Sequence, residues 1–255
     1  MKLVDPKSLT VLVTGATAGF GEAIAERFIK EGSRVVACGR RADRLKALAK
    51  RLGKRCHAGA LDVRDRGASR RFIEGLRPPF DRLNVVVANA GLALGLASAV
   101  EADLDDWDTM IDTNVKGALY TVKAALPGML ARDEGHVVFL GSVAADYPYP
   151  GGNCYGATKA FVRQFALNLR ADLLGANVRV TNVEPGLAET EFSLVRFKGD
   201  AEKAAAPYKG IAPLTAEDVA ETVFWACTLP RHVNVNRLEI MPVMQAFGPF
   251  NFKRK

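Results

Sequence analysis

Short apolar runs alternate along this chain with longer stretches in which apolar residues recur at helical spacing. The apolar runs predict six strands, over Thr10–Thr14, Arg34–Cys38, Cys56–Leu61, Leu83–Ala88, His136–Leu140 and Val178–Val183. The stretches between them predict helices over about Gly21–Glu31, Asp43–Leu52, Arg66–Gly75, Trp107–Leu130 and Tyr155–Leu174. The pattern therefore predicts a regular alternation of strand and helix.

The predicted strands are continuously apolar, as expected when helices cover both faces of a sheet. Strands that alternate with helices of this length form right-handed βαβ units and a parallel sheet. Since no repeat, low-complexity segment or linker interrupts the pattern, residues 1–255 are predicted to form a single α/β domain. We expect a Rossmann-type, doubly wound parallel sheet in three layers, with ligands bound beyond the carboxyl ends of the strands.

A glycine-rich turn follows the first predicted strand and opens a helix. Its residues are Gly15, Ala16, Thr17, Ala18, Gly19, Phe20 and Gly21. Such glycines allow a tight turn and a close backbone approach, so that a pyrophosphate can lie on the helix N-terminal amides. The spacing is GxxxGxG, and a plain tight turn is the alternative.

Arg40 and Arg41 follow the second strand, where a dinucleotide fold that prefers NAD usually has an acidic residue. Guanidinium groups match the geometry of a phosphate and stay charged, so these two favour the 2′-phosphate of NADP(H). The alternative is a pair of surface arginines.

Polar and small residues also follow the third and fourth strands. Asp62, next to Val63, can accept a hydrogen bond from an adenine amino group, and Asn89 can lie close to the adenosine ribose. Each signal alone is weak, because Asp62 also suits a helix cap and Gly91 an ordinary turn.

The fifth strand is followed by Ser142, and Tyr155 and Lys159 come thirteen residues later on one face of a predicted helix. A nearby ammonium group and a helix N-terminus are expected to lower the pKa of Tyr155. Tyr155 can then exchange a proton with a developing alkoxide while Ser142 donates a hydrogen bond to the same oxygen. This set predicts hydride transfer at a carbonyl or alcohol carbon.

Composition narrows the remaining classes of function and partner. The chain is 49% hydrophobic and 25% charged, with a net charge of +7 whose basic residues form no stripe, so no nucleic-acid partner is expected. Four scattered cysteines indicate reduced thiols, with Cys154 a packing thiol, and three dispersed histidines predict no metal site. With no apolar run of the roughly 18 residues a span needs and no signal pattern at Met1–Pro6, we expect a cytoplasmic protein without a membrane partner.

The chain resembles the short-chain dehydrogenase/reductase family over nearly its whole length, through TGATAGFG, NAG, the Ser–Tyr–Lys set and the loop 185–190. The resemblance implies four catalytic residues: Asn114, Ser142, Tyr155 and Lys159. It implies that Asn114 holds a water linked to Lys159, and that Lys159 binds the nicotinamide ribose. It also implies cofactor contacts from Pro185, Gly186, Leu187 and Thr190, and a homotetramer whose interface uses the two longest helices. Where the family commonly has NNAG, this chain has Ala88 in place of the first asparagine.

Further motifs, among them YGATKAFVRQF and FKGD, resemble the NADP-dependent 3-hydroxy acid dehydrogenases. That likeness implies interconversion of a small 3-hydroxy acid (serine, allo-threonine or 3-hydroxypropionate type) and its semialdehyde. Reduction of another small acidic aldehyde of the sulfoacetaldehyde type, or of a bulkier ketone, stays open. A non-catalytic NADPH-binding regulator is the alternative from another class.

The residues that contact the substrate are predicted from their positions in the sequence. Residues 187–212 are expected to form a lid, in which Arg196 or Lys198 could bind a substrate carboxylate. Ser142 and Asn153 complete the candidate substrate contacts, and a solvated lid residue is the alternative for Arg196. The tail 243–255, with its aromatic run 247–252, is expected to pack on a neighbouring subunit or on the rim of the pocket.

Overall fold

Seven parallel strands form one sheet in the computed structural model, which describes residues 2–248. Their order is β3-β2-β1-β4-β5-β6-β7, with all neighbours parallel. The strands are β1 (Thr10–Thr14), β2 (Arg34–Gly39), β3 (Cys56–Ala60), β4 (Val85–Ala88), β5 (Gly135–Leu140), β6 (Val178–Pro185) and β7 (Arg237–Ile240). The predicted parallel Rossmann-type sheet is confirmed.

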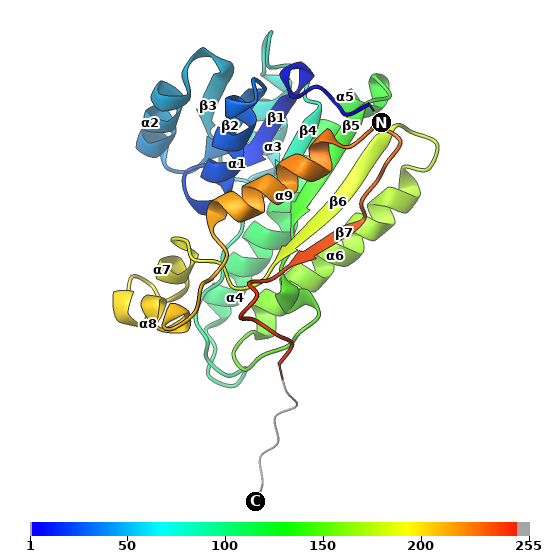
Figure 1. Ribbon diagram of the computed structural model, residues 1–255. Helices are drawn as coiled ribbons and strands as arrows, with labels where there is room; N and C mark the ends of the chain where they lie inside the picture. Colours follow the sequence, from blue (N-terminus) through cyan, green and yellow to red (C-terminus); the bar gives the residue numbers. More distant parts are fainter. Residues whose placement is uncertain (1, 249–255) are drawn as a thin grey trace, which may run out of the picture.

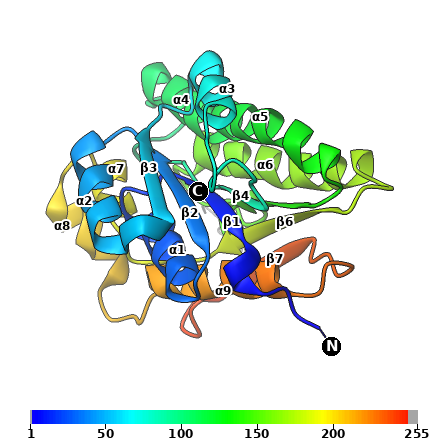
Figure 2. The same cartoon turned by 90° about the horizontal axis from the view of Figure 1, so that it is seen from above.

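Helices cover both faces of the sheet, so the molecule has the predicted three layers (Figures 1 and 2). One layer holds α1 (Gly19–Lys30), α2 (Ala42–Leu52) and α9 (Ala216–Thr228), and the other holds α3 (Arg66–Glu74), α5 (Gly117–Ala131) and α6 (Asn153–Asp172). Three short helices, α4 (Leu104–Met110), α7 (Phe192–Arg196) and α8 (Ala201–Ala205), lie in the connections that follow β4 and β6.

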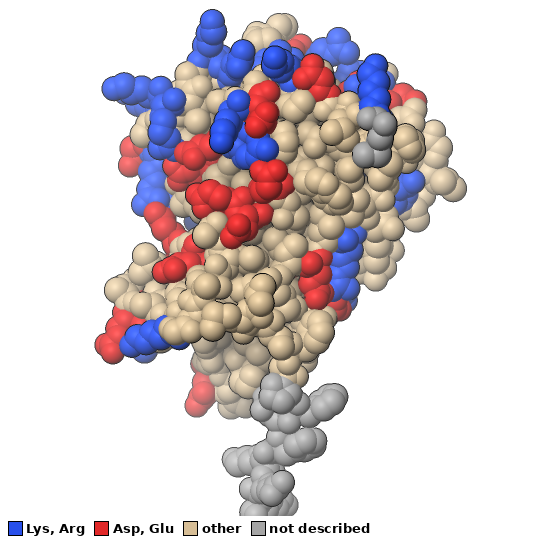
Figure 3. Space-filling model, viewed as in Figure 1, with Lys and Arg blue, Asp and Glu red and all other residues tan. Residues whose placement is uncertain are grey.

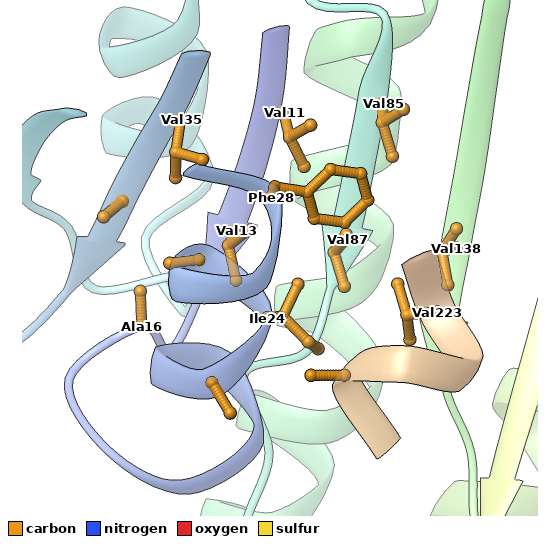
Figure 4. Packing of buried hydrophobic residues seen from close by; sticks show 14 of the residues in the cluster. Val11, Val13, Ala16, Ile24, Phe28, Val35, Val85, Val87, Val138 and Val223 are labelled. Atoms are coloured by element: carbon orange, nitrogen blue, oxygen red, sulfur yellow. The ribbon is translucent and has the colours of Figure 1, made fainter. Parts of the chain in front are cut away.

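The strands bury side chains on both faces, which explains why they lack polar alternation. Figure 4 shows one of the two cores, where Phe28 and Ile24 of α1 pack on Val13 and Val87 of the sheet. Phe28 also meets Phe224 of α9 edge to face, with ring centroids 5.3 Å apart. This packing fixes α1 against the sheet, and with it the glycine-rich turn that opens the helix.

Besides the short helices α7 and α8, the prediction omitted α9 and β7. The signal for α9 was present, since Thr215 and Asp218 form a reciprocal capping box and Val219, Val223 and Cys227 give an apolar stripe. Strand β7 is short and partly exposed at the sheet edge, and its sequence Arg-Leu-Glu-Ile has no continuous apolar run. The prediction overlooked a helix whose local signal existed and a strand whose local signal was weak.

The predicted helical region over about Trp107–Leu130 is present, and it contains a local irregularity. The segment divides into α4, a π-helical turn over Ile111–Lys116, and α5. Such turns widen the helix locally and are frequent at functional sites. This one carries Asn114, which is 2% exposed.

Most charged side chains in the view of Figure 3 gather over its upper part, where Lys and Arg lie beside Asp and Glu, and much of the lower part is uncharged. Within residues 2–248, no helix combines the length and apolar character required to cross a membrane.

Candidate active site

A cleft of about 280 Å³ lies beyond the carboxyl ends of the strands and contains most of the residues predicted to bind a cofactor. Those in its walls are Gly15, Thr17, Ala18, Gly19, Phe20, Arg40, Arg41, Asp62, Val63, Asn89, Tyr155, Lys159 and Thr190. They come from the segments that follow β1, β2, β3 and β4, from α6, and from the start of the predicted lid. The sheet therefore gathers residues that are up to 175 positions apart, from Gly15 to Thr190, in one cleft.

The glycine-rich turn has the geometry that a phosphate cradle needs. Gly15 and Gly19 both have positive φ (68° and 52°), a conformation that favours glycine. No side chain caps the N-terminus of α1, so its first-turn amides are available to an anion. Ala16 and Gly21 lie behind the turn: Ala16 donates its N–H to the Cys38 carbonyl, and a Cβ on Gly21 would lie 2.4 Å from the Gly15 carbonyl oxygen.

Asn89 and Asp62 are already engaged within the chain. The Asn89 amide donates to the Thr14 carbonyl oxygen over 2.7 Å, which ties the end of β4 to the glycine-rich turn. The Asp62 carboxylate accepts hydrogen bonds from the side chain of Arg64, which hold the pKa of Asp62 below its ordinary value. Their predicted contacts with adenosine stay predictions.

Lys159 and Asn114 converge around Gly91, and Lys159 also lies near Tyr155. A Cβ on Gly91 would lie 3.2 Å from Asn114 Oδ1 and 3.4 Å from Lys159 Nζ, so only a glycine leaves both groups undisturbed. Lys159 Nζ donates to the Leu140 carbonyl over 2.7 Å and lies 5.8 Å from the centre of the Tyr155 ring.

The side chain of Asn114 is fully occupied by neighbours. Its Oδ1 accepts from the backbone N–H of Leu92 (2.8 Å), and its Nδ2 donates to the Leu92 carbonyl (2.8 Å) and to Thr158 Oγ1 (3.0 Å). Asn114 thus fixes the segment after Gly91 onto α6, and its implied water relay to Lys159 stays a prediction.

The expected lowering of the Tyr155 pKa is wrong for this structure. Desolvation raises the pKa of Tyr155 to about 12 and outweighs the opposing effects of the Ser142 hydrogen bond and of Arg196. Desolvation also lowers the pKa of Lys159 to about 8. The phenol is therefore protonated at neutral pH, and the site is ready to donate a proton.

Arg196 lies beside Tyr155, as the prediction for a substrate contact requires. Its guanidinium carbon is 5.2 Å from the centre of the Tyr155 ring and 5.5 Å from that of Phe192, and its Nη2 donates to the Tyr149 hydroxyl over 2.5 Å. Its Nε is buried and lacks a hydrogen-bond partner. No carboxylate within residues 2–248 forms an ion pair with Arg196.

Asn153 and Lys198, which were also predicted as possible substrate contacts, are bonded to other parts of the chain. The exposed Asn153 donates from Nδ2 to the Ala97 carbonyl and accepts from the backbone N–H of Cys154, so it serves the first turn of α6. Lys198 forms an ion pair with Asp106 of α4 at 2.9 Å. Of the two lid cations predicted to bind a substrate carboxylate, Arg196 is the one without an ion-pair partner among residues 2–248.

The predicted lid is anchored by backbone hydrogen bonds in its middle and at its start. The backbone N–H of Gly95 donates to the Arg196 carbonyl over 2.9 Å. At the start of the lid, Gln245 Oε1 accepts from the backbone N–H of Leu187 over 2.7 Å, while Gly186 N–H donates to the Ile240 carbonyl. Pro185, Gly186 and Leu187 therefore contact the C-terminal segment, and Thr190 is the predicted residue of this loop that reaches the cleft.

Within the predicted tail 243–255, Phe247 stacks near Tyr147 with ring centroids 4.7 Å apart. The remainder of the aromatic run, residues 249–252, lies outside the described residues, so its predicted packing stays a prediction.

The sequence analysis did not predict two charged residues that meet Arg41 or its partner beside the cleft, Arg44 and Glu191. Arg44 lies one helical turn after Arg41, a spacing that could have identified it. Glu191 has no comparable local signal, because it meets the arginines only through the fold, from 147 and 150 positions away.

A carboxylate cluster was also not predicted. Asp146, Glu184 and Glu239 bring their oxygens within 4.8 Å of one another. Arg163 pairs with Asp146, and Arg237 pairs with all three acids. The two guanidinium groups balance most of this charge, so the cluster is an ion-pair network.

Comparison with known proteins places the chain among dehydrogenases. Residues 9–200 match the family model described as short chain dehydrogenase. The NADP-dependent 3-hydroxy acid dehydrogenase YdfG of Salmonella typhi is 55% identical over 247 residues, which cover 96% of this chain and 100% of that protein. The serine 3-dehydrogenase of Rhizobium radiobacter is 51% identical over 246 residues, which cover 96% of this chain and 98% of that protein.

Solved structures agree with this comparison of sequences. A closed form of serine dehydrogenase complexed with NADP⁺ superposes with a TM-score of 0.96 at 54% identity, covering 97% of this chain and 100% of that one. A serine dehydrogenase from Escherichia coli gives a TM-score of 0.84 at 49% identity, covering 94% of this chain and 100% of that one. With the cradle, the Ser–Tyr–Lys arrangement and these likenesses together, the chain belongs to the short-chain dehydrogenase family.

Proposed function

We propose that this protein is an NADP(H)-dependent dehydrogenase that interconverts a small 3-hydroxy acid, of the serine or 3-hydroxypropionate type, and its carbonyl form. The observation that carries the substrate class is Arg196, a guanidinium beside Tyr155 with a buried, unpartnered Nε. A buried donor left without a partner is unfavourable, so the site favours a substrate that brings an acceptor. A carboxylate supplies two acceptors that match the guanidinium fork.

The residues present fit a dinucleotide cofactor. The positive φ of Gly15 and Gly19 and the uncapped start of α1 suit a pyrophosphate, and Arg40 and Arg41 suit a 2′-phosphate. Relatives at 55% identity are named as NADP-dependent, which supports the same preference here. When bound, the nicotinamide supplies or accepts the hydride.

The chain's own residues supply the proton and the electrostatics. In the reducing direction, Tyr155 donates its phenolic proton to the carbonyl oxygen, so that the carbonyl becomes the alcohol and Tyr155 becomes a phenolate. Ser142 donates a hydrogen bond to the same oxygen, and the Lys159 ammonium stabilises the phenolate. Oxidation runs through the same groups in reverse.

A substrate panel tests this proposal. Serine, 3-hydroxypropionate, sulfoacetaldehyde, a bulkier ketone and a simple alcohol are each followed by NADPH absorbance, with wild-type protein and with Arg196→Ala. We expect turnover of the acidic compounds, and a KM for them that rises about 10- to 100-fold in Arg196→Ala, the scale of one lost charge-assisted contact.

Neutral substrates provide the comparison, because their KM should change little in Arg196→Ala. Lys198→Ala is the matched control, since it removes a lid cation that is paired with Asp106. An unchanged KM for acids in Arg196→Ala would show that Arg196 does not bind the substrate anion. If only sulfoacetaldehyde or only the bulkier ketone is turned over, that compound class, and not the 3-hydroxy acids, is the substrate.

We also propose that the protein is a cytoplasmic homotetramer, in line with the family resemblance. The four cysteines are free, and burial raises the pKa of Cys38 and Cys227 to about 12, which suits a reducing compartment. Apolar side chains on α5 and α6, among them Phe161 and Leu167, are more than two-fifths exposed, which suits an interface between copies of the chain.

A further inference from the structure

Arg41, at the end of β2, presents two distinct sides to its surroundings. Its Nε and Nη2 both donate to Thr17 Oγ1, over 3.0 and 2.8 Å, and so this edge faces the glycine-rich turn. Its Nη1 donates in another direction, to Glu191 Oε2 over 3.1 Å. One guanidinium therefore links the cofactor turn to the first residues of the lid.

Arg44 is held by the same carboxylate. Its Nη1 lies 2.8 Å from both oxygens of Glu191 and 3.5 Å from the Thr17 carbonyl oxygen. Glu191 thus joins two arginines of one helical face, and neither arginine has another carboxylate partner within residues 2–248. All three side chains are about two-fifths exposed, so ligands can reach them.

Glu191 is held in this position by its neighbours in the lid. A Cβ on Gly19 would lie 3.3 Å from the Cβ of Thr190, so the lid packs directly against the glycine-rich turn. This packing places the Glu191 carboxylate next to Arg41 and Arg44.

We propose that Glu191 is a positioning residue that orients Arg41, with Arg44 as a third cation, to bind the 2′-phosphate of NADP(H); this proposal rests on the proposed NADP(H) dependence. Glu191 takes the Nη1 nitrogen and keeps the Nε–Nη2 edge turned toward the glycine-rich turn, where both nitrogens donate to Thr17 Oγ1. A phosphate that replaces this hydroxyl would accept two parallel hydrogen bonds from that edge. The lid would thereby contribute to the choice between the two nicotinamide cofactors.

Charge balance is compatible with this role. Arg40, Arg41 and Arg44 carry three positive charges near the cleft, and Glu191 neutralises one of them. The remaining excess of two matches a phosphate of nearly two negative charges. A competing role, in which Glu191 occupies the phosphate's place and is displaced by it, predicts the opposite change in affinity.

Isothermal titration calorimetry tests the proposal. The Kd values for NADPH and for NADH are measured in the absence of substrate for wild type, Glu191→Gln, Arg41→Met and the double variant. We expect Glu191→Gln to weaken NADPH binding about two- to fivefold, the scale of partly exposed ion pairs, and to leave NADH binding unchanged. In the Arg41→Met background, Glu191→Gln should have no further effect on NADPH binding.

Glu189→Gln is the matched control, since it removes an exposed lid carboxylate for which no pairing with these arginines occurs in the described part of the chain. Equal weakening of both cofactors by Glu191→Gln would show that Glu191 only supports the lid. Tighter NADPH binding would show competition with the phosphate, and an unchanged Kd would show no role at all. Each of these results overturns the inference, whereas wild-type protein that does not prefer NADPH would overturn the proposed cofactor itself.

Discussion

Tyr155 shows how far burial can reverse an expectation drawn from neighbouring charges. An ammonium four residues away on a helix predicts a lowered pKa, but the Lys159 ammonium is bound to the Leu140 carbonyl and lies 5.8 Å from the ring centre. Desolvation then dominates for both groups, raising the pKa of Tyr155 to about 12 and lowering that of Lys159 to about 8. The protein alone thus favours a neutral phenol and an ammonium that is readily lost.

These pKa values predict opposite pH trends for the two directions of reaction. Reduction requires a phenol that can donate and a charged Lys159, so kcat/KM for reduction should be level below about pH 8 and fall above it, as Lys159 loses its proton. Oxidation requires the phenolate and should become faster as the pH rises. The measurement is kcat/KM in both directions between pH 6 and 10.

Tyr155→Phe is the control for this experiment. It removes the proton donor without removing the ring, so turnover should be lost while NADPH binding, followed by calorimetry, remains. Full activity in Tyr155→Phe would favour the non-catalytic regulator, because the proton would not pass through this residue. A reduction rate that is flat to pH 10 would show that Lys159 does not assist the proton transfer.

At the scale of elements, the glycine-rich turn depends on how closely α1 approaches the sheet. A Cβ at Gly21 would lie 2.4 Å from the Gly15 carbonyl oxygen and 2.6 Å from Asn89 Nδ2. The Asn89 amide donates a hydrogen bond to the Thr14 carbonyl. Neither this amide nor the backbone of the turn can move away from the added methyl group without distorting the glycine-rich turn. Gly21 therefore sets the distance between helix and turn.

Gly21→Ala should lower the free energy of unfolding by about 1–3 kcal/mol, as overpacking does elsewhere, and should weaken NADPH binding. Urea denaturation and calorimetry measure the two effects. Gly128→Ala is the matched control, because Gly128 is exposed in α5 and its added methyl would meet the flexible end of Arg132 at 3.3 Å. That change should instead stabilise the helix by up to about 1 kcal/mol. Equal effects of the two substitutions would contradict this explanation.

At the scale of the molecule, two cores on opposite faces hold the sheet, one of which is drawn in Figure 4, and residues that follow several of its strands line one cleft. The layer of α5 and α6 still leaves apolar side chains exposed, with Phe161 at 42% and Leu167 at 44%. A second copy of the chain would cover them, and that is the basis of the proposed tetramer.

Light scattering on the eluting protein should give a mass four times that of the 27.5 kDa chain. The double substitution of Phe161 and Leu167 by Glu should reduce this mass, because charges would enter the interface. Leu3→Glu, at a more exposed apolar residue near the N-terminus, should leave the mass unchanged. A wild-type mass of a single chain would exclude the tetramer.

The sequence by itself determined the parallel sheet, the single domain, the glycine-rich turn and the Ser142–Tyr155–Lys159 set. These depend on local patterns: apolar runs form buried strands, glycines permit positive φ, and residues four apart share a helix face. The parallel sheet brings the carboxyl ends of its strands together. Functional residues at separate positions in the sequence could therefore be predicted to lie in one site.

Only the tertiary structure decided which charges face each other and how strongly water is excluded. Arg196 lies against Tyr155, Lys198 pairs with Asp106, and Glu191 reaches Arg41 across 150 positions. The direction of the Tyr155 pKa shift was decided in the same way, since it depends on the burial of the phenol. Contacts between distant residues and the desolvation of a group are properties of packing, and no local pattern in the sequence specifies them.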